Sequence, residues 1–235
     1  FEDNAIVLIP RSDLEYKETW YVAGLKSSAS NSFLAEDVFV PDHRVLRVTP
    51  AIEGDYPGVD EHSEAPYKAA MVPVLEAQLL GAHLGMGQRV LELVRADASK
   101  KGIAYTTYER QSDSVPFQLA LARAALLLDS AELFAYNAAK EIDEATQSGD
   151  YLDYGSRARQ RGHQAQVVAN VKDAIDILMT AHGSAGFAES SELQRFWRDQ
   201  AIAARHGLTL PDTGLEVYGR WLATGEEGNP ATPFV

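Results

Sequence analysis

Cysteine is absent from this chain of 235 residues. Its absence excludes disulfide bonds, thiolate catalysis and metal centres ligated by cysteine. Because chains without disulfides suit a reducing compartment, we expect a cytoplasmic protein. Long apolar runs are missing too, since no stretch approaches the roughly 20 apolar residues that cross a bilayer. We therefore expect no membrane partner.

Basic residues are also scarce. Lys and Arg number 21 against 34 Asp and Glu, which gives a net charge of −13. Such a surface repels a phosphate backbone, so we expect no nucleic-acid partner. The acidic residues 60–64 include His62 but no second histidine at ligand spacing, so we predict a solvated loop there and no metal site. Hydrophobic residues make up 46% of the chain, which is ample for a core.

Residues 1–50 have the composition of β-strands. The chain opens on Phe1 without an initiator methionine, and strand-like sequence follows almost at once over residues 5–9, so we expect that something N-terminal is missing. Aromatic and β-branched residues predict two further strands, over residues 19–23 and 33–40. Proline, glycine and acidic residues gather in 51–66, which is predicted to be a surface linker.

Helical periodicity replaces strand periodicity after this linker. Long helices with turn-rich breaks predict an antiparallel four-helix bundle over residues 67–225, followed by a tail at 226–235. Gly81 and Gly85, one turn apart, predict a close-packing face. Several helices are apolar almost all round, which favours further burial between subunits. The expected fold class is α+β, predominantly α, with helices over 67–100, 115–147, 155–180, 190–206 and 215–222.

Three segments carry residues that suit a ligand, and each has a plainer explanation. The hydroxyl-rich loop 24–32 beside Trp20 suits the edge of a planar heterocycle, or it is a polar hairpin turn. His206, expected to end its helix, suits a proton donor near neutral pH or a helix cap. Glycines in the loop 181–187 suit phosphate oxygens or a tight connection between helices.

The helix expected over 190–206 also carries three arginines. Helical spacing predicts that Arg195, Arg198 and Arg205 project from one side, beside an apolar face and together with Asp199. Charged groups in such surroundings are costly unless they bind a partner. We therefore expect these residues to hold an anionic or proton-active group.

Three motifs follow one another along the chain. They read Trp20-x-x-x-Gly24-Leu-Lys-Ser-Ser-Ala-Ser-Asn, then Asp37-Val-Phe-Val-Pro-Asp-His-Arg44, then Gly183-Ser-Ala-Gly with Leu193-Gln-Arg-Phe-Trp-Arg-Asp-x6-His206. In this order they resemble the motifs of group D flavin-dependent monooxygenases, the oxygenase components of two-component systems, which have the acyl-CoA dehydrogenase fold. The resemblance reaches to about residue 222 and implies that residues 1–50 are the second half of a central β domain.

The resemblance also implies a function. The cofactor would be FMNH2 or FADH2 supplied by a separate flavin reductase, with O2 as co-substrate. A C4a-hydroperoxyflavin would hydroxylate a small, aromatic substrate, and the bundle would assemble a homotetramer. By residue, the resemblance makes His206 and Ser30 catalytic and assigns flavin contacts to Trp20, Ser28, Ser30, Gly183, Ser184 and Arg198.

Two positions depart from the family pattern. Ala29 stands where the family has a glycine between the two hydroxyls, which restricts the backbone there. An arginine usual after the first bundle helix is not matched near Lys100, and Arg110 is a candidate substitute.

The alternative function is an FAD-dependent acyl-CoA dehydrogenase, whose family has a similar Arg-Asp helix. There a glutamate in a Tyr-Glu-Gly-Thr segment serves as the base, whereas residues 205–209 here contain no carboxylate. This favours oxygenation, although Glu216 further along keeps the alternative open. A helical oligomer that has lost catalysis is a third hypothesis.

Overall fold

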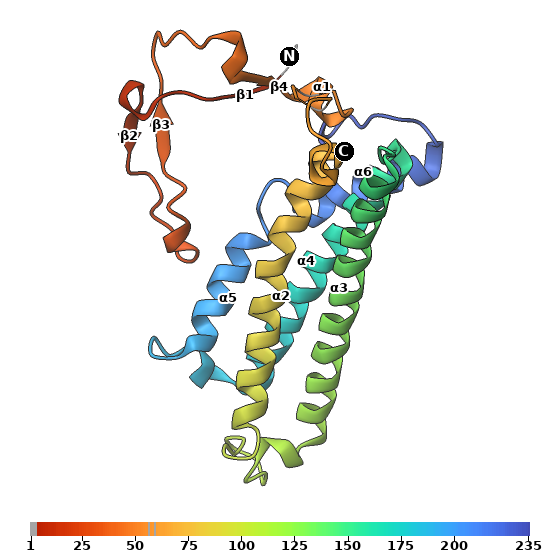
Figure 1. The fold of residues 1–235 in the computed structure, drawn as a ribbon. Coiled ribbons are helices and arrows are strands. Elements are labelled where there is room, and N and C mark those ends of the chain that lie inside the picture. Colours follow the sequence, from red (N-terminus) through yellow and green to blue (C-terminus); the bar gives the residue numbers. More distant parts are fainter. Residues whose placement is uncertain (1–3, 56, 59) are drawn as a thin grey trace.

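The computed structural model describes residues 4–55, 57–58 and 60–235 (Figure 1). Its first part contains two separate antiparallel ladders of two strands each. In the first ladder, β1 (Ala5–Val7) pairs with β4 (Val45–Arg47). In the second, β2 (Glu15–Lys17) pairs with β3 (Ser32–Leu34). All three residues of β1, β2 and β3 are exposed, so this part has little core of its own.

The strand predicted over residues 19–23 is wrong. The backbone N–H groups of Thr19 and Trp20 both donate to the side chain of Asn31, so a side chain takes the place of a partner strand. The strand predicted over 33–40 is shorter than expected and ends at Leu34. Asp37 follows with a φ of 52°, a left-handed conformation that interrupts extended backbone.

The helices match the predicted pattern closely, with small shifts at their ends. The helix expected from residue 67 begins instead at Met71, because Pro66 lies in a short 3-10 turn and Ala69 is extended. His206 lies beyond its helix, which ends at Ala203. The α-helices are α1 (Val48–Ile52), α2 (Met71–Asp97), α3 (Val115–Ser148), α4 (Tyr154–His182), α5 (Glu192–Ala203) and α6 (Pro211–Thr224).

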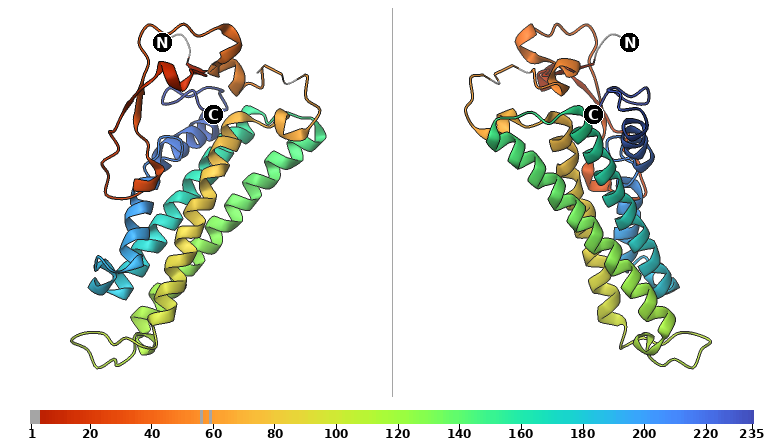
Figure 2. Two further views of the ribbon diagram at one scale, coloured as in Figure 1. Left: turned by 60° about the vertical axis from the view of Figure 1, so that its left-hand side comes forward. Right: turned by 90° about the vertical axis from the view of Figure 1, so that its right-hand side faces the viewer.

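Helices α2, α3 and α4 form three long members of a bundle, and α5 with α6 runs along α4 as the fourth (Figures 1 and 2). Trp197 of α5 donates to Asp176 at 2.8 Å, whereas Tyr218 of α6 lies against Gly162. From Trp197 to Tyr218 the residue number rises, while the contacted residue of α4 falls from Asp176 to Gly162. Helices α5 and α6 therefore run antiparallel to α4. The expected fold class, α+β and predominantly α with a four-helix bundle, is confirmed.

Close helix packing depends on glycines other than those predicted. A Cβ on Gly87 would lie 2.5 Å from Leu128 Cδ2, and one on Gly214 would lie 2.6 Å from the carbonyl oxygen of Arg161. By contrast, a Cβ on Gly81 or Gly85 would meet nothing within 4 Å among the atoms of the described residues. The face predicted from Gly81 and Gly85 therefore makes no close contact within this chain.

An apolar stripe on α3 faces outward. Leu119, Leu126 and Leu133 are spaced by seven residues and are 52%, 67% and 73% exposed. A spacing of seven keeps these leucines on one side of the helix. This stripe corresponds to the excess apolar surface expected from the sequence. Among the helices in the described part of the chain, none has both the length and the apolarity that a membrane crossing requires.

Candidate functional site

The loop after Trp20 is closed by Asn31. The side-chain oxygen of Asn31 accepts the backbone N–H groups of Thr19 and Trp20, both at 2.9 Å. Its Nδ2 donates to the hydroxyl of Tyr16 at 2.7 Å. The indole Nε1 of Trp20 donates across the loop to the carbonyl of Leu25 at 2.9 Å. These bonds fold the segment into a compact turn around the half-buried Trp20.

Helix α5 holds this loop from far along the sequence. The carboxylate of Asp199 accepts the backbone N–H of Leu25 at 2.6 Å, and the guanidinium of Arg198 donates to the carbonyl of Ala23. A Cβ on Gly24 would lie only 2.4 Å from the carbonyl oxygen of Arg198. The backbone of the loop therefore lies directly against α5 (Figure 1). The side chains of Asp199 and Arg198 dock the loop on the bundle.

Each arginine of this segment has a partner within the chain. The expectation that these residues hold an anionic or proton-active group stays a prediction. Arg195 contacts Glu192 and the ring of Phe196, Arg198 contacts Ala23, and Arg205 contacts Ala201.

The two serines of the loop present hydroxyls to the outside. The Oγ atom of Ser28 donates to the carbonyl of Leu25 at 2.9 Å and lies 3.3 Å from the Oγ atom of Ser30. Both side chains are exposed. Ala29 between them has a φ of 49°, in the left-handed region that favours glycine. The loop therefore keeps the backbone shape that a glycine would give it, at a cost of about 1–2 kcal/mol.

His206 lies in the turn that follows α5. Its backbone N–H donates to the carbonyl of Ala203 at 3.1 Å, and its Nδ1 accepts the backbone N–H of Leu208 at 3.3 Å. The side chain is exposed. Because it lies outside the helix, His206 is not the last helical residue that the sequence indicated. It lies seven residues after Asp199, near the same end of α5 as the loop.

A second histidine, missed by the sequence analysis, is buried beside this turn. His83 on α2 is 2% exposed, and its Nδ1 lies 2.9 Å from Oε1 of Gln200 on α5. Burial lowers the pKa of His83, its hydrogen bond with Gln200 raises it, and the charge of His206 lowers it. A single histidine on a long apolar helix gave no signal that it would meet α5.

Gly183 and Ser184 lie at the opposite end of α5. Gly183 ends α4 with a φ of 88°, a conformation that favours glycine. Lys101, which the sequence analysis did not identify, donates to the carbonyl of His182. Gln111 donates to the same carbonyl at 3.2 Å. A cation therefore stands beside the Gly183 loop, at the place where the family's arginine was not matched.

The structure thus divides the predicted residues into two groups. Trp20, Ser28 and Ser30 lie on one loop, Arg198 of α5 contacts that loop, and His206 lies in the turn after α5. Gly183 and Ser184 lie before the N-terminal end of α5, whereas the loop docks further along this helix, at Arg198 and Asp199. Arg110, the candidate substitute for the family's arginine, pairs with Asp113 at 2.9 Å.

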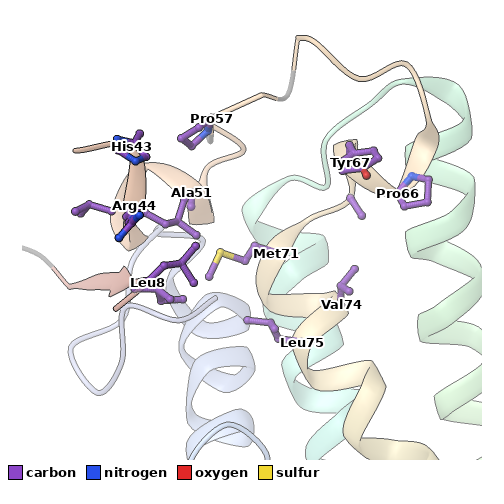
Figure 3. Close-up of a pocket in the computed structure, with 14 residues that line it drawn as sticks. Leu8, His43, Arg44, Ala51, Pro57, Pro66, Tyr67, Met71, Val74 and Leu75 are labelled. Atoms are coloured by element: carbon purple, nitrogen blue, oxygen red, sulfur yellow. The ribbon is translucent and has the colours of Figure 1, made fainter. Parts of the chain in front are cut away.

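An apolar cavity lies away from these residues. It has a volume of about 540 Å³ and lies between the first ladder and the start of α2. Leu8, Met71 and Leu75 line its floor, with His43 and Arg44 at one end and Tyr67 at the other (Figure 3). Its lining shares no residue with the loop after Trp20 or the turn of His206.

Residues 79–211 match the family model described as acyl-CoA dehydrogenase, C-terminal domain. Over 226 residues the chain is 29% identical to a flavin-dependent monooxygenase oxygenase subunit, HsaA, of Rhodococcus jostii, covering 96% of this chain and 58% of that protein. It is 28% identical to the oxygenase component of p-hydroxyphenylacetate 3-hydroxylase of Acinetobacter baumannii, covering 95% of this chain and 53% of that protein.

Solved structures agree with these relatives. XiaF from Streptomyces sp., in complex with FADH2 and glycerol, superposes with a TM-score of 0.88 at 35% identity, covering 95% of this chain and 56% of XiaF. The 3-HSA hydroxylase from Rhodococcus sp. RHA1 superposes with a TM-score of 0.87 at 26% identity, covering 99% of this chain and 59% of that chain. The chain spans about half the length of the relatives it matches. The resemblance seen in the sequence motifs is confirmed.

Proposed function

We propose that this chain, which belongs to the acyl-CoA dehydrogenase C-terminal domain family, forms part of the oxygenase component of a two-component flavin-dependent monooxygenase. The observation that carries the proposal is the docking of the hydroxyl-bearing loop on α5 through Asp199 and Arg198, close to the turn of His206. The names of the relatives favour oxygenation over the dehydrogenase alternative. Glu216, which kept that alternative open, is exposed on α6.

The cofactor we propose is a reduced flavin from a separate reductase, with O2 as co-substrate. FADH2 is preferred to FMNH2, since the 35% identical XiaF is a complex with FADH2. When bound, the reduced flavin supplies two electrons to dioxygen, so that one oxygen atom enters the substrate and the other leaves as water. We propose a small aromatic substrate.

The residues of the loop fit the planar end of such a group. The aromatic face of Trp20 flanks it, and the exposed hydroxyls of Ser28 and Ser30 offer donors to its polar edge. Arg198 holds the carbonyl of Ala23, so its main contribution is to keep the loop in place. Its direct contact with flavin remains a prediction.

His206 is the group that we propose holds or moves a proton. Its imidazole is exposed and its Nδ1 is occupied by the N–H of Leu208, so Nε2 is the nitrogen available to a bound molecule. An imidazole titrates near neutral pH, which suits it to proton control in an oxygenation. Ser30 assists from the loop side.

The phosphate end of the flavin is assigned to Gly183 and Ser184, with Lys101 as the cation beside them. Because they lie before the N-terminal end of α5 whereas the loop docks further along this helix, we propose that they serve the flavin held by a neighbouring copy. We also propose the domain division expected from the sequence, with residues 1–50 in a β domain, 51–66 as a linker, 67–225 in the bundle and 226–235 as a tail.

Replacing His206 by alanine tests the proposed function. With the full-length protein, FADH2 and O2, we expect about 100-fold less hydroxylated product per flavin oxidised, because a proton-controlling group is lost. Hydrogen peroxide should rise correspondingly while the affinity for FADH2 changes little. Product is measured by chromatography on a panel of phenols, and the assay is repeated with FMNH2.

His43→Ala is the matched control, because His43 is an exposed histidine in the β region. This variant should leave the ratio of hydroxylated product to oxidised flavin unchanged. Equal product from wild type and His206→Ala, or no flavin affinity in any state, would count against the monooxygenase. Reduction of a tightly bound FAD by an acyl-CoA would favour the dehydrogenase.

We further propose that the stripe of Leu119, Leu126 and Leu133 on α3 packs against a second copy in a homotetramer. Exchange of Leu126 and Leu133 together for lysine should dissociate the assembly. Each leucine contributes about 1.5–3 kcal/mol when buried, so the dissociation constant should rise at least about 100-fold. Sedimentation velocity measures the change. Leu222→Lys on α6, also an exposed leucine, should leave the assembly intact.

A further inference from the structure

A single peptide unit links the turn of His206 to the bundle interior. The carbonyl of Leu208 accepts a hydrogen bond from Nη1 of Arg161 on α4. The N–H of the same Leu208 donates to Nδ1 of His206 at 3.3 Å. Arg161 in turn forms an ion pair with Glu76 on α2. Three segments, α2, α4 and the turn, therefore meet at one guanidinium group.

The ion pair is buried, with 3% of the Arg161 side chain and 1% of the Glu76 side chain exposed. Buried ion pairs rarely stabilise a protein more than apolar residues of the same size would. Stability alone therefore does not explain this pair. Arg161 also orients the turn, since the same Nη1 atom that pairs with Glu76 donates to the carbonyl of Leu208.

The backbone of Arg161 is held in place as well. Gly214 of α6 lies against it, and a Cβ there would be 2.6 Å from the carbonyl oxygen of Arg161. Burial lowers the pKa of Arg161 to about 10, so the guanidinium still carries its proton at neutral pH. It therefore donates to Leu208 across the range in which an imidazole titrates.

The hydrogen bond from the N–H of Leu208 determines which nitrogen of the neutral His206 imidazole carries the proton. Because Nδ1 of His206 is an acceptor here, the neutral ring carries its proton on Nε2. On the other side, the pair of His83 and Gln200 joins α2 to the end of α5 just before the turn. Two buried polar pairs, His83 with Gln200 and Glu76 with Arg161, therefore lie beside the turn. Of these residues, Arg161 donates a hydrogen bond to the backbone of the turn.

We propose that Glu76 and Arg161 are positioning residues for His206, which hold the Leu208 peptide so that the imidazole keeps its Nε2–H directed outward. The role of that imidazole toward flavin rests on the proposed function. The positioning itself does not, and it can be measured without flavin.

The first experiment measures the carbethoxylation of His206 by diethylpyrocarbonate, resolved by mass spectrometry on the full-length protein. In wild type, Nδ1 is engaged and Nε2 is protonated, so reaction should be slow. Arg161→Lys keeps the positive charge but lacks the planar guanidinium. We expect His206 to react about tenfold faster in this variant, with the exposed His43 as an unchanged internal reference.

Arg157 offers a matched control one turn earlier on α4. Its side chain is 4% exposed and pairs with Glu53 at 2.8 Å, but it donates to Ile52 and Val235 instead of the turn. Arg157→Lys should perturb the bundle to a similar extent and leave the reactivity of His206 unchanged. Equal acceleration by both lysine variants, or none with Arg161→Lys, would overturn the inference.

The second experiment measures turnover. In Arg161→Lys, kcat for product should fall roughly 10- to 100-fold with little change in the KM for substrate, since a misplaced group affects the reaction more than binding. If His206 becomes reactive in Arg161→Lys while no variant and no wild type hydroxylates any substrate, the proposed function fails and the positioning stands. Unchanged His206 reactivity would remove the positioning even if the enzyme is a monooxygenase.

Discussion

The substitution Gly24→Val should remove flavin-dependent turnover while leaving the helical bundle folded. A Cβ on Gly24 would lie 2.4 Å from the carbonyl oxygen of Arg198 and 2.8 Å from the backbone nitrogen of Asp199. These are backbone atoms of α5, which cannot move aside as the end of a flexible side chain can. The loop must therefore leave α5, which breaks its bonds to Asp199 and Arg198.

We expect product formation by Gly24→Val to fall by at least about 100-fold, because displacement by about an ångström is enough to cost that much. Flavin affinity is measured by fluorescence and helix content by circular dichroism. Gly219→Ala on α6 is the matched control, since a Cβ there would meet nothing within 4 Å in the described part of the chain. Normal turnover in a folded Gly24→Val protein would show that the docked loop is not part of the site.

Arg161→Met should lower the free energy of unfolding more than any other single substitution proposed for this protein. This change leaves the Glu76 carboxylate, which is 1% exposed, without its cation inside the bundle. Removing one partner of a buried pair typically costs about 3–5 kcal/mol. Urea unfolding followed by circular dichroism measures the effect as a lower midpoint.

The double variant Glu76→Leu with Arg161→Met should recover most of that loss, because apolar residues of similar size need no desolvation of charge. It should not recover the slow carbethoxylation of His206, since nothing then donates to the carbonyl of Leu208. A double variant as unstable as Arg161→Met would mean that the pair stabilises the fold through packing and not through charge compensation.

The local pattern of the sequence was sufficient for the helices. Apolar residues recurring at helical spacing, with proline near the start of α3 and glycine after its end, depend only on neighbours along the chain. The motifs around Trp20 and His206 were equally visible, because they are short and contiguous. Residues 19–23 were wrongly predicted as a strand, because their aromatic composition favours a strand only where a partner strand exists. The local sequence does not show whether such a partner is present.

The buried polar contacts had no local signal. His83 and Gln200 are separated by 117 positions, and Arg161 and Leu208 by 47. Residues so far apart meet only when the helices pack, and one sequence does not show which polar side chains face each other across an interface. Lys101 was missed for the same reason, since its contact with His182 depends on how the connection after α2 folds back.

By itself, the sequence determined that the chain is mostly helical, that it has a bundle after a β region, and that it carries hydroxyls after Trp20 and an imidazole at position 206. These properties follow from local periodicity and residue chemistry. Only the tertiary structure decided that the loop docks on α5 through Asp199, that Arg198 contacts the carbonyl of Ala23, and that Arg161 reaches the turn of His206. Packing decides these features because each requires two distant backbones to approach within hydrogen-bonding distance.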